Sequence, residues 1–201
     1  MLVTGGSGVA LGLPAAYRRR GLLQHKSGAD SLPKIGGAAA VLAGSCSAAT
    51  LGQIANFKGP HLALDTDAIC RGEPVGNKAL AWAKDKLGNG PILLSASDKP
   101  EAVKALQQKY GVEKSSHAIE KTMASLARGL VDAGVGRMVV AGGETSGAVV
   151  SALDITALRI GPEIDPGVPW TASIAKKPML LALKSGNFGA ADFFTKAFHQ
   201  I

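Results

Sequence analysis

The sequence predicts an α/β fold, a three-layer sandwich with a mostly parallel sheet and with ligand loops at the carboxyl ends of its strands. From residue 36 onward, short apolar runs alternate with segments of helical periodicity. Apolar residues make up 46 % of the chain and aromatic residues 4 %, so the core must consist mainly of small and branched side chains. Such side chains suit helices packed on a buried sheet.

The first 35 residues do not look like a self-sufficient unit. Residues 2–4 are expected to be the end of a strand, and a glycine-rich turn and a short helix through Ala16 and Tyr17 follow. A strand that starts at residue 2 has no upstream partner, which suggests that the chain was cut from something longer. The 26 glycines, many of which flank apolar runs, indicate turns and close backbone approaches, not a disordered linker.

The regular part of the chain is expected to alternate between strands and helices. The apolar runs between glycine, proline and polar residues predict strands at 38–43, 61–64, 91–95, 137–141, 158–160 and 179–183. Helical spacing predicts helices at 48–57, 73–87, 101–110, 117–133, 148–153 and 191–198. In the helix at 117–133, Ile119, Met123, Leu126 and Leu130 form an amphipathic stripe. Three prolines in residues 161–169 predict a stiff connection without regular structure.

The charge of the chain favours an anionic partner. The net charge is +7 and the pI is about 9.5. Nucleic acid is a weak candidate, because the only basic run, residues 18–20, suits a solvated helix end and no aromatic residues are interleaved with it. A phosphorylated small molecule fits the charge equally well.

Other classes of protein are disfavoured by residue type and spacing. Cys46 and Cys70 form no Cys-x-x-Cys pair, and the four histidines lack metal-ligand spacing, so neither a disulfide scaffold nor a zinc site is expected. No apolar run approaches the ~20 residues of a membrane span, and the N-terminus lacks the pattern of a signal peptide. We therefore expect a cytoplasmic protein with no membrane partner.

Three loops share one design, in which glycine and hydroxyl residues follow an apolar strand and open a helix. They are Gly44–Ser47, Gly142–Gly147 and Lys184–Gly189. Helix N-termini at the carboxyl ends of strands offer free N–H groups to phosphate, and Lys184 would add charge. The three loops are therefore expected to form one phosphate-binding site, although neither a P-loop nor a strict G-x-G-x-x-G motif is present.

Structural alternatives stay open for the polar residues of these loops. Thr145 and Ser146 would also serve as helix N-caps, with the glycines as turns. Glu144 suits a ribose hydroxyl or Mg²⁺, or else the dipole of the helix that it opens. Asp65 and Asp67 suit a metal or a base, or else a turn.

The loops together resemble a known family. "VVAGGETSGAVV", "IGPEIDPGVPW", "LALKSGNFGAADFF" and "VLAGSCSAATLGQI" are similar to the C-terminal nucleotide-binding domain of the four-carbon acid sugar kinases. "LVTGGSGVALGLP" resembles the end of that family's substrate-binding domain. The resemblance divides the chain into residues 1–35, the tail of an otherwise absent N-terminal domain, and residues 36–201, a nucleotide-binding domain.

The resemblance implies a function and a set of contacts. Family members transfer the γ-phosphoryl group of ATP, with Mg²⁺, to the 4-hydroxyl of threonate, erythronate or 3-oxo-tetronate. Besides Lys184, the implied cofactor-binding residues are Ser45, Gly143, Glu144, Thr145, Ser146, Gly186 and Gly189, with the last two as alternatives to each other. The catalytic base belongs to the missing domain, and within this chain only Asp65, Asp67 and Asp165 are candidates for it.

Three hypotheses follow for the chain itself. The first is an ATP-binding part of a sugar-acid kinase that binds ATP but is inactive without its N-terminal domain. The second is a nucleotide-binding module without catalysis, and the third is an effector-type or nucleic-acid interaction protein. A homodimer is also considered, but the sequence does not fix the oligomeric state or the preferred sugar acid.

Overall fold

The computed structural model describes residues 4–201, and the chain divides into two units, Met1–Ser31 and Leu32–Ile201. In the first unit a 3₁₀ helix η1 (Ser7–Gly12) leads into helix α1 (Leu13–Arg19). No residue of α1 is buried. The strand end expected at residues 2–4 lies largely outside the described residues, and Thr4 belongs to no strand.

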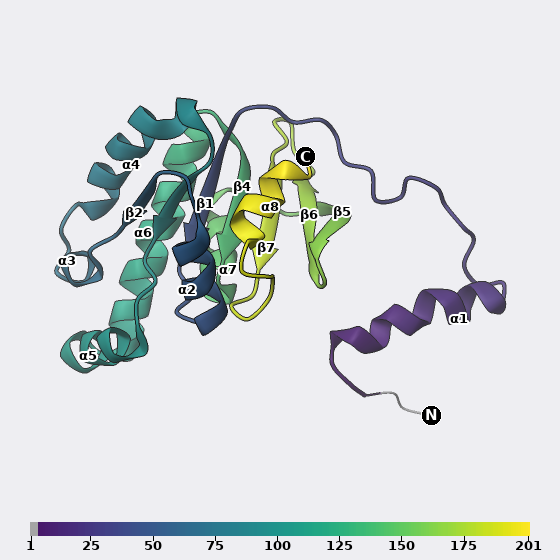
Figure 1. The fold of residues 1–201 in the computed structure, drawn as a ribbon, viewed down its shortest axis with the longest axis horizontal. Helices are drawn as coiled ribbons and strands as arrows, with labels where there is room; N and C mark the ends of the chain where they lie inside the picture. The colour runs from purple at the N-terminus through teal and green to yellow at the C-terminus, as the bar shows by residue number, and fades with distance from the viewer. Residues whose placement is uncertain (1–3) are drawn as a thin grey trace. The chain divides into compact units, whose positions relative to one another are not determined.

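The second unit is a seven-stranded sheet with helices on both faces (Figure 1). Its strands, in the order in which they lie, are β2 (His61–Ala63), β3 (Ile92–Ser95), β1 (Ala38–Ala43), β4 (Val135–Ala141), β7 (Leu180–Lys184), β6 (Val168–Ser173) and β5 (Leu158–Asp165). The first five are parallel to one another, and β6 runs antiparallel to both β5 and β7. The mostly parallel sheet predicted from the alternating pattern is confirmed.

The two faces of the sheet carry separate cores, which makes the unit a three-layer sandwich. One core joins the sheet to α4 (Val75–Lys86), α6 (Val112–Asp132) and α7 (Gly143–Ala152). The other joins it to α2 (Ala48–Asn56) and α8 (Phe193–His199). In β4, Met138 and Val140 face the first core while Val139 and Ala141 face the second. Burial on both faces explains why the strands are continuous apolar runs.

The chain changes direction across the sheet between β1 and β4. After β1 it builds β2 and β3 on one side, and it then crosses to build β4 and β7 on the other. Helix α2, which follows β1, packs in one layer, and helix α7, which follows β4, packs in the opposite layer. Such a switch point opens a crevice at the carboxyl ends of the two strands, where ligands bind in open α/β sheets.

The prediction of an irregular connection at residues 161–169 is wrong. Strands β5 and β6 form an antiparallel hairpin there, with shifts of register between Ile160 and Glu163 and between Glu163 and Asp165. Strand β5 is at the edge of the sheet, where a proline removes no essential hydrogen bond. Gly167 turns the chain with a φ of +80°, so the Pro-Gly pair makes a hairpin turn.

Helices α6 and α7 both begin five residues before their predicted limits, and α7 begins at Gly143 and not at 148, within the predicted loop. Helix α6 begins at Val112 and not at 117, because Gly111 turns the chain with a φ of +86° and lets the polar residues before the apolar stripe form its first turns. A short helix α3 (Thr66–Cys70) stands where a turn was expected. Helix α5 (Pro100–Tyr110) follows β3 as predicted, with a boundary that moves by one residue.

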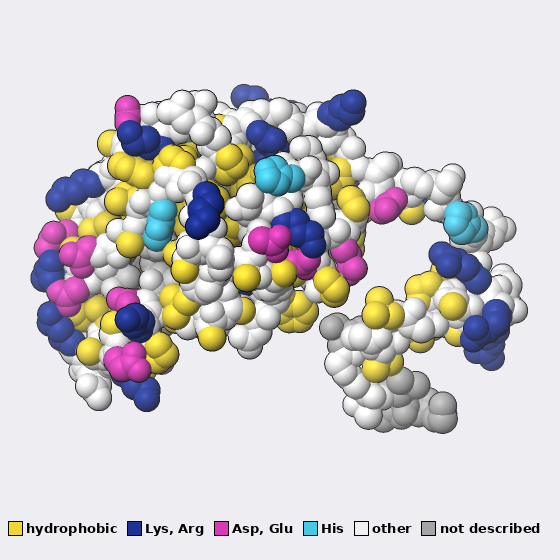
Figure 2. All heavy atoms as spheres, viewed as in Figure 1, with side chains coloured by type: hydrophobic (Ala, Val, Ile, Leu, Met, Phe, Trp, Pro, Cys, Tyr) yellow, Lys and Arg dark blue, Asp and Glu magenta, His cyan; other side chains and the backbone are white. Residues whose placement is uncertain are grey.

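The surface of the second unit does not gather its basic residues into one stripe on the face drawn in Figure 2. Lys and Arg side chains are spread over that face and intermixed with acidic ones. Such a distribution gives little support to nucleic-acid binding, which uses a continuous basic track. None of the helices in residues 4–201 is long and apolar enough to cross a membrane.

Candidate functional site

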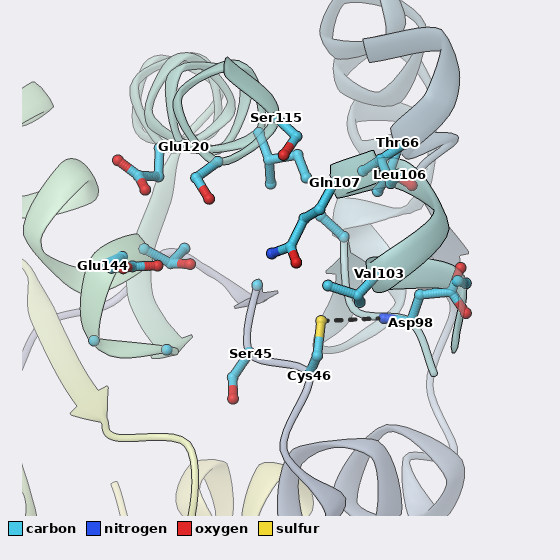
Figure 3. A pocket seen from close by; sticks show the side chains of 18 residues that line it. Ser45, Cys46, Thr66, Asp98, Val103, Leu106, Gln107, Ser115, Glu120 and Glu144 are labelled. Carbon is cyan, nitrogen blue, oxygen red and sulfur yellow. Dashed lines mark hydrogen bonds between the residues drawn. The ribbon is translucent and has the colours of Figure 1, made fainter. Parts of the chain in front are cut away.

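A cavity of about 390 Å³ lies at the carboxyl ends of β1 and β4. The loop after β1, the loop after β4 and helices α5 and α6 surround it (Figure 3). Its lining comprises Gly44, Ser45, Cys46, Thr66, Ala96, Asp98, Ala102, Val103, Leu106, Gln107, Ser115, Ser116, Ile119, Glu120, Gly142, Gly143, Glu144 and Thr145. The cavity thus occupies the crevice that the switch point of the sheet creates.

The loops after β1 and β4 are in direct contact. The backbone N–H groups of Gly44 and Ser45 both donate to the carbonyl of Ala141, over 2.9 and 3.1 Å. A Cβ atom added at Gly44 would lie 2.2 Å from Oγ1 of Thr145, which is buried. Glycine is therefore required at position 44, and the predicted convergence of Ser45 and Thr145 on one edge of the sheet is confirmed.

The N-terminus of α7 is open toward this cavity. Its N-cap is Gly142, with a φ of +130°, and no side chain caps the helix. The first intrahelical hydrogen bond here is that from Ser146 N to Gly142 O, 2.8 Å long. The N–H groups of the first helical turn therefore have no intrahelical partner, and the positive end of the helix dipole faces the cavity. Thr145 and Ser146 are not N-caps, so that alternative reading is wrong.

The cavity has an acidic and an apolar side. Asp98, Glu120 and Glu144 line it, and no lysine or arginine does. In Figure 3, Glu120 and Glu144 approach from α6 and α7, and Gln107 extends from α5 into the middle of the space. Within the described residues, none of these three carboxylates takes part in an ion pair. An anion bound in this cavity would therefore have to be stabilised by the N-terminus of α7 or by a cation that binds together with the anion.

The apolar side of the cavity was missed by sequence reasoning. Val103 and Leu106 of α5 and Ile119 of α6 form it, together with alanines at 96 and 102. From the sequence, Ile119 was predicted to pack only in the core, and no residue of α5 was predicted to bind a ligand. The structure shows what the sequence did not, since α5 carries apolar residues and buries none of them completely.

The loop after β7 lies beside the loop after β1. A Cβ atom added at Gly186 would lie 2.6 Å from Ser45 Oγ and 3.2 Å from Ser47 Oγ. Ser47 Oγ donates to Gly186 O over 2.5 Å, and its side chain also caps α2 by accepting from Thr50 N. The structure thus brings the three predicted loops together, and the loop after β1 is close to both of the others.

Four of the predicted site residues line the cavity and four do not. Ser45, Gly143, Glu144 and Thr145 line it. Ser146, Lys184, Gly186 and Gly189 are absent from the lining, although a Cβ atom added at Gly186 would lie 2.6 Å from Oγ of Ser45, which does line the cavity. Lys184 is completely buried, and its ammonium donates to Thr50 Oγ1, Ser185 O and Gly186 O over 3.0, 3.2 and 3.0 Å. Its side chain is thus directed into the loop and not at the cavity.

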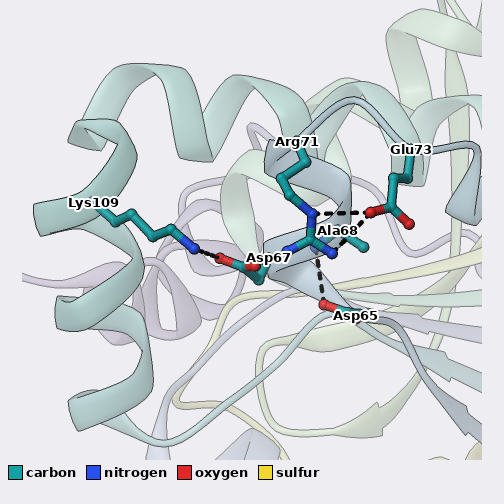
Figure 4. A network of polar contacts seen from close by, with 6 residues as sticks. All are labelled: Asp65, Asp67, Ala68, Arg71, Glu73 and Lys109. Carbon is teal, nitrogen blue, oxygen red and sulfur yellow. Dashed lines mark hydrogen bonds and ion pairs between the residues drawn. The ribbon is translucent and has the colours of Figure 1, made fainter.

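Two of the three candidate bases have structural roles near α3. Asp65 caps α3 by accepting from Ala68 N over 2.9 Å. Asp67 forms ion pairs with Arg71 and with Lys109 of α5, as Figure 4 shows. The hydrogen bond from Lys109 lowers the pKa of Asp67 below its ordinary value, which opposes a role as a base.

The third candidate base, Asp165, fastens the loop before α8. Burial raises its pKa, but hydrogen bonds from Lys196 and from Ala190 N, the latter 2.8 Å long, outweigh this and leave the pKa below its ordinary value. Within residues 4–201, no group of three or more His, Cys, Asp or Glu side chains is arranged to hold a metal ion.

Comparison with known proteins identifies the family to which the chain belongs. A family described as "Nucleotide-binding C-terminal domain" matches residues 40–194. The chain belongs to this family. The match contains all three loops and the uncapped N-terminus of α7.

The relatives of this nucleotide-binding domain include longer kinases. A 3-oxo-tetronate kinase of Burkholderia multivorans is 53 % identical over 100 % of this chain and 47 % of its own length. One of Cupriavidus necator is 52 % identical over 100 % of this chain and 46 % of its own length. A crystal structure of a Haemophilus influenzae protein has a TM-score of 0.82 and 39 % identity, covering 92 % of this chain and 45 % of that one. The chain spans about half the length of the curated relatives that it matches.

Proposed function

We propose that this chain is the ATP-binding C-terminal part of a kinase that phosphorylates the 4-hydroxyl of four-carbon sugar acids. The observation that carries the proposal is the uncapped N-terminus of α7, which opens on a cavity beside Ser45 in a chain of the nucleotide-binding family. The names of the relatives support a kinase that acts on a tetronate. The specific sugar acid would be selected by residues outside this chain.

The two sides of the cavity suggest how ATP lies in it. The free N–H groups of Gly143, Glu144 and Thr145 and the hydroxyl of Ser45 would hold phosphate oxygens. The apolar side formed by α5 and α6 would cover the base, and Gln107 would meet its polar edge. Glu144 would then accept a ribose hydroxyl or hold Mg²⁺.

The residues of the cavity are compatible with Mg²⁺ that arrives with the phosphates. Mg²⁺ prefers oxygen ligands and usually combines one or two carboxylates with phosphates and water. Asp98, Glu120 and Glu144 supply such oxygens, and no lysine or arginine of the lining competes with them. When bound, the cation would neutralise charge on the β- and γ-phosphates, while the chain itself positions the nucleotide.

A second domain is expected to supply the sugar-acid pocket and the base. We propose that the tail of that domain, expected at residues 1–35, ends with the first unit at Ser31, because α1 buries none of its residues and Leu11 and Leu22 are 80 % and 70 % exposed, whereas Leu32 and Ile35 pack against the second core. Phosphoryl transfer consists largely of positioning and charge stabilisation, so a separate nucleotide domain forms a coherent half of the enzyme. Because all three aspartates considered as bases are engaged elsewhere, this chain alone should be inactive.

The alternative is a nucleotide-binding module without catalysis, and a single pair of measurements distinguishes the two. Calorimetric titration with Mg-ATP should give one site, of modest affinity because half of the cleft wall is absent. Incubation with Mg-ATP and threonate, erythronate or 3-oxo-tetronate should release no ADP above background until the matching N-terminal domain is added. ADP release after the N-terminal domain is added supports the kinase. No ADP release, despite ATP binding, favours the non-catalytic module. If the chain does not bind ATP, both hypotheses are refuted. Size-exclusion chromatography with light scattering tests the homodimer.

A further inference from the structure

A buried lysine, Lys184, lies behind the loop after β7. It is the last residue of that strand and has no solvent exposure. Within residues 4–201 its ammonium forms no ion pair and hydrogen-bonds only to neutral oxygens, those of Thr50, Ser185 and Gly186. Burial lowers the pKa of Lys184 to about 8. Burying an uncompensated charge is unfavourable, so a residue that only stabilised the fold would have no reason to be a lysine here.

One face of α2 holds the same loop from the other side. Ser47, Thr50 and Gln53 are spaced three residues apart and all bond to the loop at 186–190. Thr50 Oγ1 donates to Gly186 O over 3.0 Å. Gln53 Nε2 donates to the carbonyls of residues 188, 189 and 190 over 3.0, 2.9 and 3.0 Å.

These contacts converge on a single carbonyl group. Gly186 O accepts from Ser47 Oγ, Thr50 Oγ1 and Lys184 Nζ. A carbonyl with this many donors, one of them charged, is held more firmly than one with a single neutral donor. A Cβ atom added at the same glycine would lie 2.6 Å from Oγ of Ser45, a residue that lines the cavity.

We propose that Lys184 and Thr50 are positioning residues that immobilise the loop at 185–190, and thereby fix the Ser45 hydroxyl for the nucleotide. The effect on the loop needs no ligand, whereas the effect on the nucleotide rests on the proposed function above. Lys184 acts through Gly186, and its ammonium does not touch the phosphates. This role accounts for a lysine whose side chain is directed away from the cavity and for the density of donors at one carbonyl.

The first arm of the test uses Lys184→Met, which keeps an unbranched side chain, one heavy atom shorter, and removes the ammonium group. Lys177→Met is the matched control, because Lys177 is exposed just before β7. Amide hydrogen exchange of residues 185–190 should quicken in Lys184→Met and remain unchanged in Lys177→Met. The melting temperature should not fall, since a buried charge is replaced by an apolar group of similar size.

The second arm measures the nucleotide. Lys184→Met should weaken Mg-ATP binding by about tenfold, the effect expected from losing charge-assisted hydrogen bonds that order a binding loop. Thr50→Val should weaken it in the same direction, and Thr50→Ser, which keeps the hydroxyl, should restore the wild-type value. Rescue by serine would not be expected if only packing mattered.

The outcomes separate this proposal from the proposed function. Faster exchange confined to the loop, with weaker ATP binding and an unchanged melting temperature, supports the positioning role. Unchanged exchange of residues 185–190 in Lys184→Met overturns it, and so does a loss of binding that merely follows a lower melting temperature. If the wild-type chain does not bind ATP, the proposed function fails, whereas loop exchange still decides whether Lys184 immobilises the loop.

Discussion

Gly186 lies so close to Ser45 that a Cβ atom at position 186 would be 2.6 Å from the serine Oγ. The two residues come from loops that follow different strands, β7 and β1, which lie on either side of β4. Their contact joins the loop after β7 to the one that lines the cavity. A side chain at Gly186 must therefore displace the hydroxyl that we assign to the nucleotide.

We expect Gly186→Ala to weaken Mg-ATP binding by about tenfold, because overpacking of this size costs about 1–3 kcal/mol and its strain falls on Ser45. Isothermal titration calorimetry provides the measurement. Gly52→Ala is the control, since Gly52 lies in α2 and a Cβ atom there meets nothing within 4 Å. Equal affinities for the two variants would show that Ser45 does not contact the nucleotide.

Gly44→Ala should destabilise the fold by about 1–3 kcal/mol, because the new Cβ atom would lie 2.2 Å from Thr145 Oγ1. Urea unfolding measures the loss. The same substitution in a Thr145→Ala background should cost less, since the clashing oxygen is gone, and such non-additivity is the signature of direct contact. Additive losses would mean that the two loops do not touch in solution.

Glu144→Gln tests an exposed acid of the cavity lining. If Glu144 accepts a ribose hydroxyl or holds Mg²⁺, the substitution should weaken Mg-ATP binding by about tenfold. Glu101→Gln is the matched control, because Glu101 is also an exposed acid in a first helical turn but does not line the cavity. If both variants lose stability to the same extent and neither changes Mg-ATP affinity, Glu144 does not contact the nucleotide or its metal. Its role is then limited to the interaction with the helix dipole.

Asp165 should make stability depend on acid pH. Its pKa is lowered in the folded state, so its ion pair with Lys196 stabilises the fold above the ordinary aspartate pKa. This contribution is lost as the pH falls through the lower, folded value. Asp165→Asn should therefore be less stable than the wild type at neutral pH, with the difference closing below about pH 4. A constant difference across an acid titration of the unfolding free energy would contradict this.

Lys184 should make stability depend on alkaline pH. Its folded pKa of about 8 lies below its ordinary value, so between about pH 8 and pH 10 the unfolded chain binds more protons than the folded one. The wild type should gain stability relative to Lys184→Met as the pH rises through this window. Unfolding free energies of both proteins, measured at several pH values, provide the check. Parallel curves would mean that the ammonium is not buried in solution.

The sequence by itself determined the layers of the fold and the three loops. Apolar runs such as residues 137–141 alternate with amphipathic segments such as residues 117–133, and these local patterns decide which elements form. The family resemblance is also local, because it rests on the loops themselves. Even so, local rules failed at the hairpin of β5 and β6, where Pro162 lies in the edge strand, Pro166 lies in the turn and Pro169 lies near the start of β6.

Only the tertiary structure decided which residues of these loops share a cavity. The strand order places β1 beside β4, and this brings Ser45 and Thr145 into one cavity. Helices α5 and α6 add an apolar side to that cavity, which no motif in the loops predicted. The tertiary structure also turned Lys184 away from the cavity, toward Thr50 and the carbonyl of Gly186. The direction of a side chain depends on the face of the strand and on what packs there, and both are set by contacts between residues far apart in the sequence.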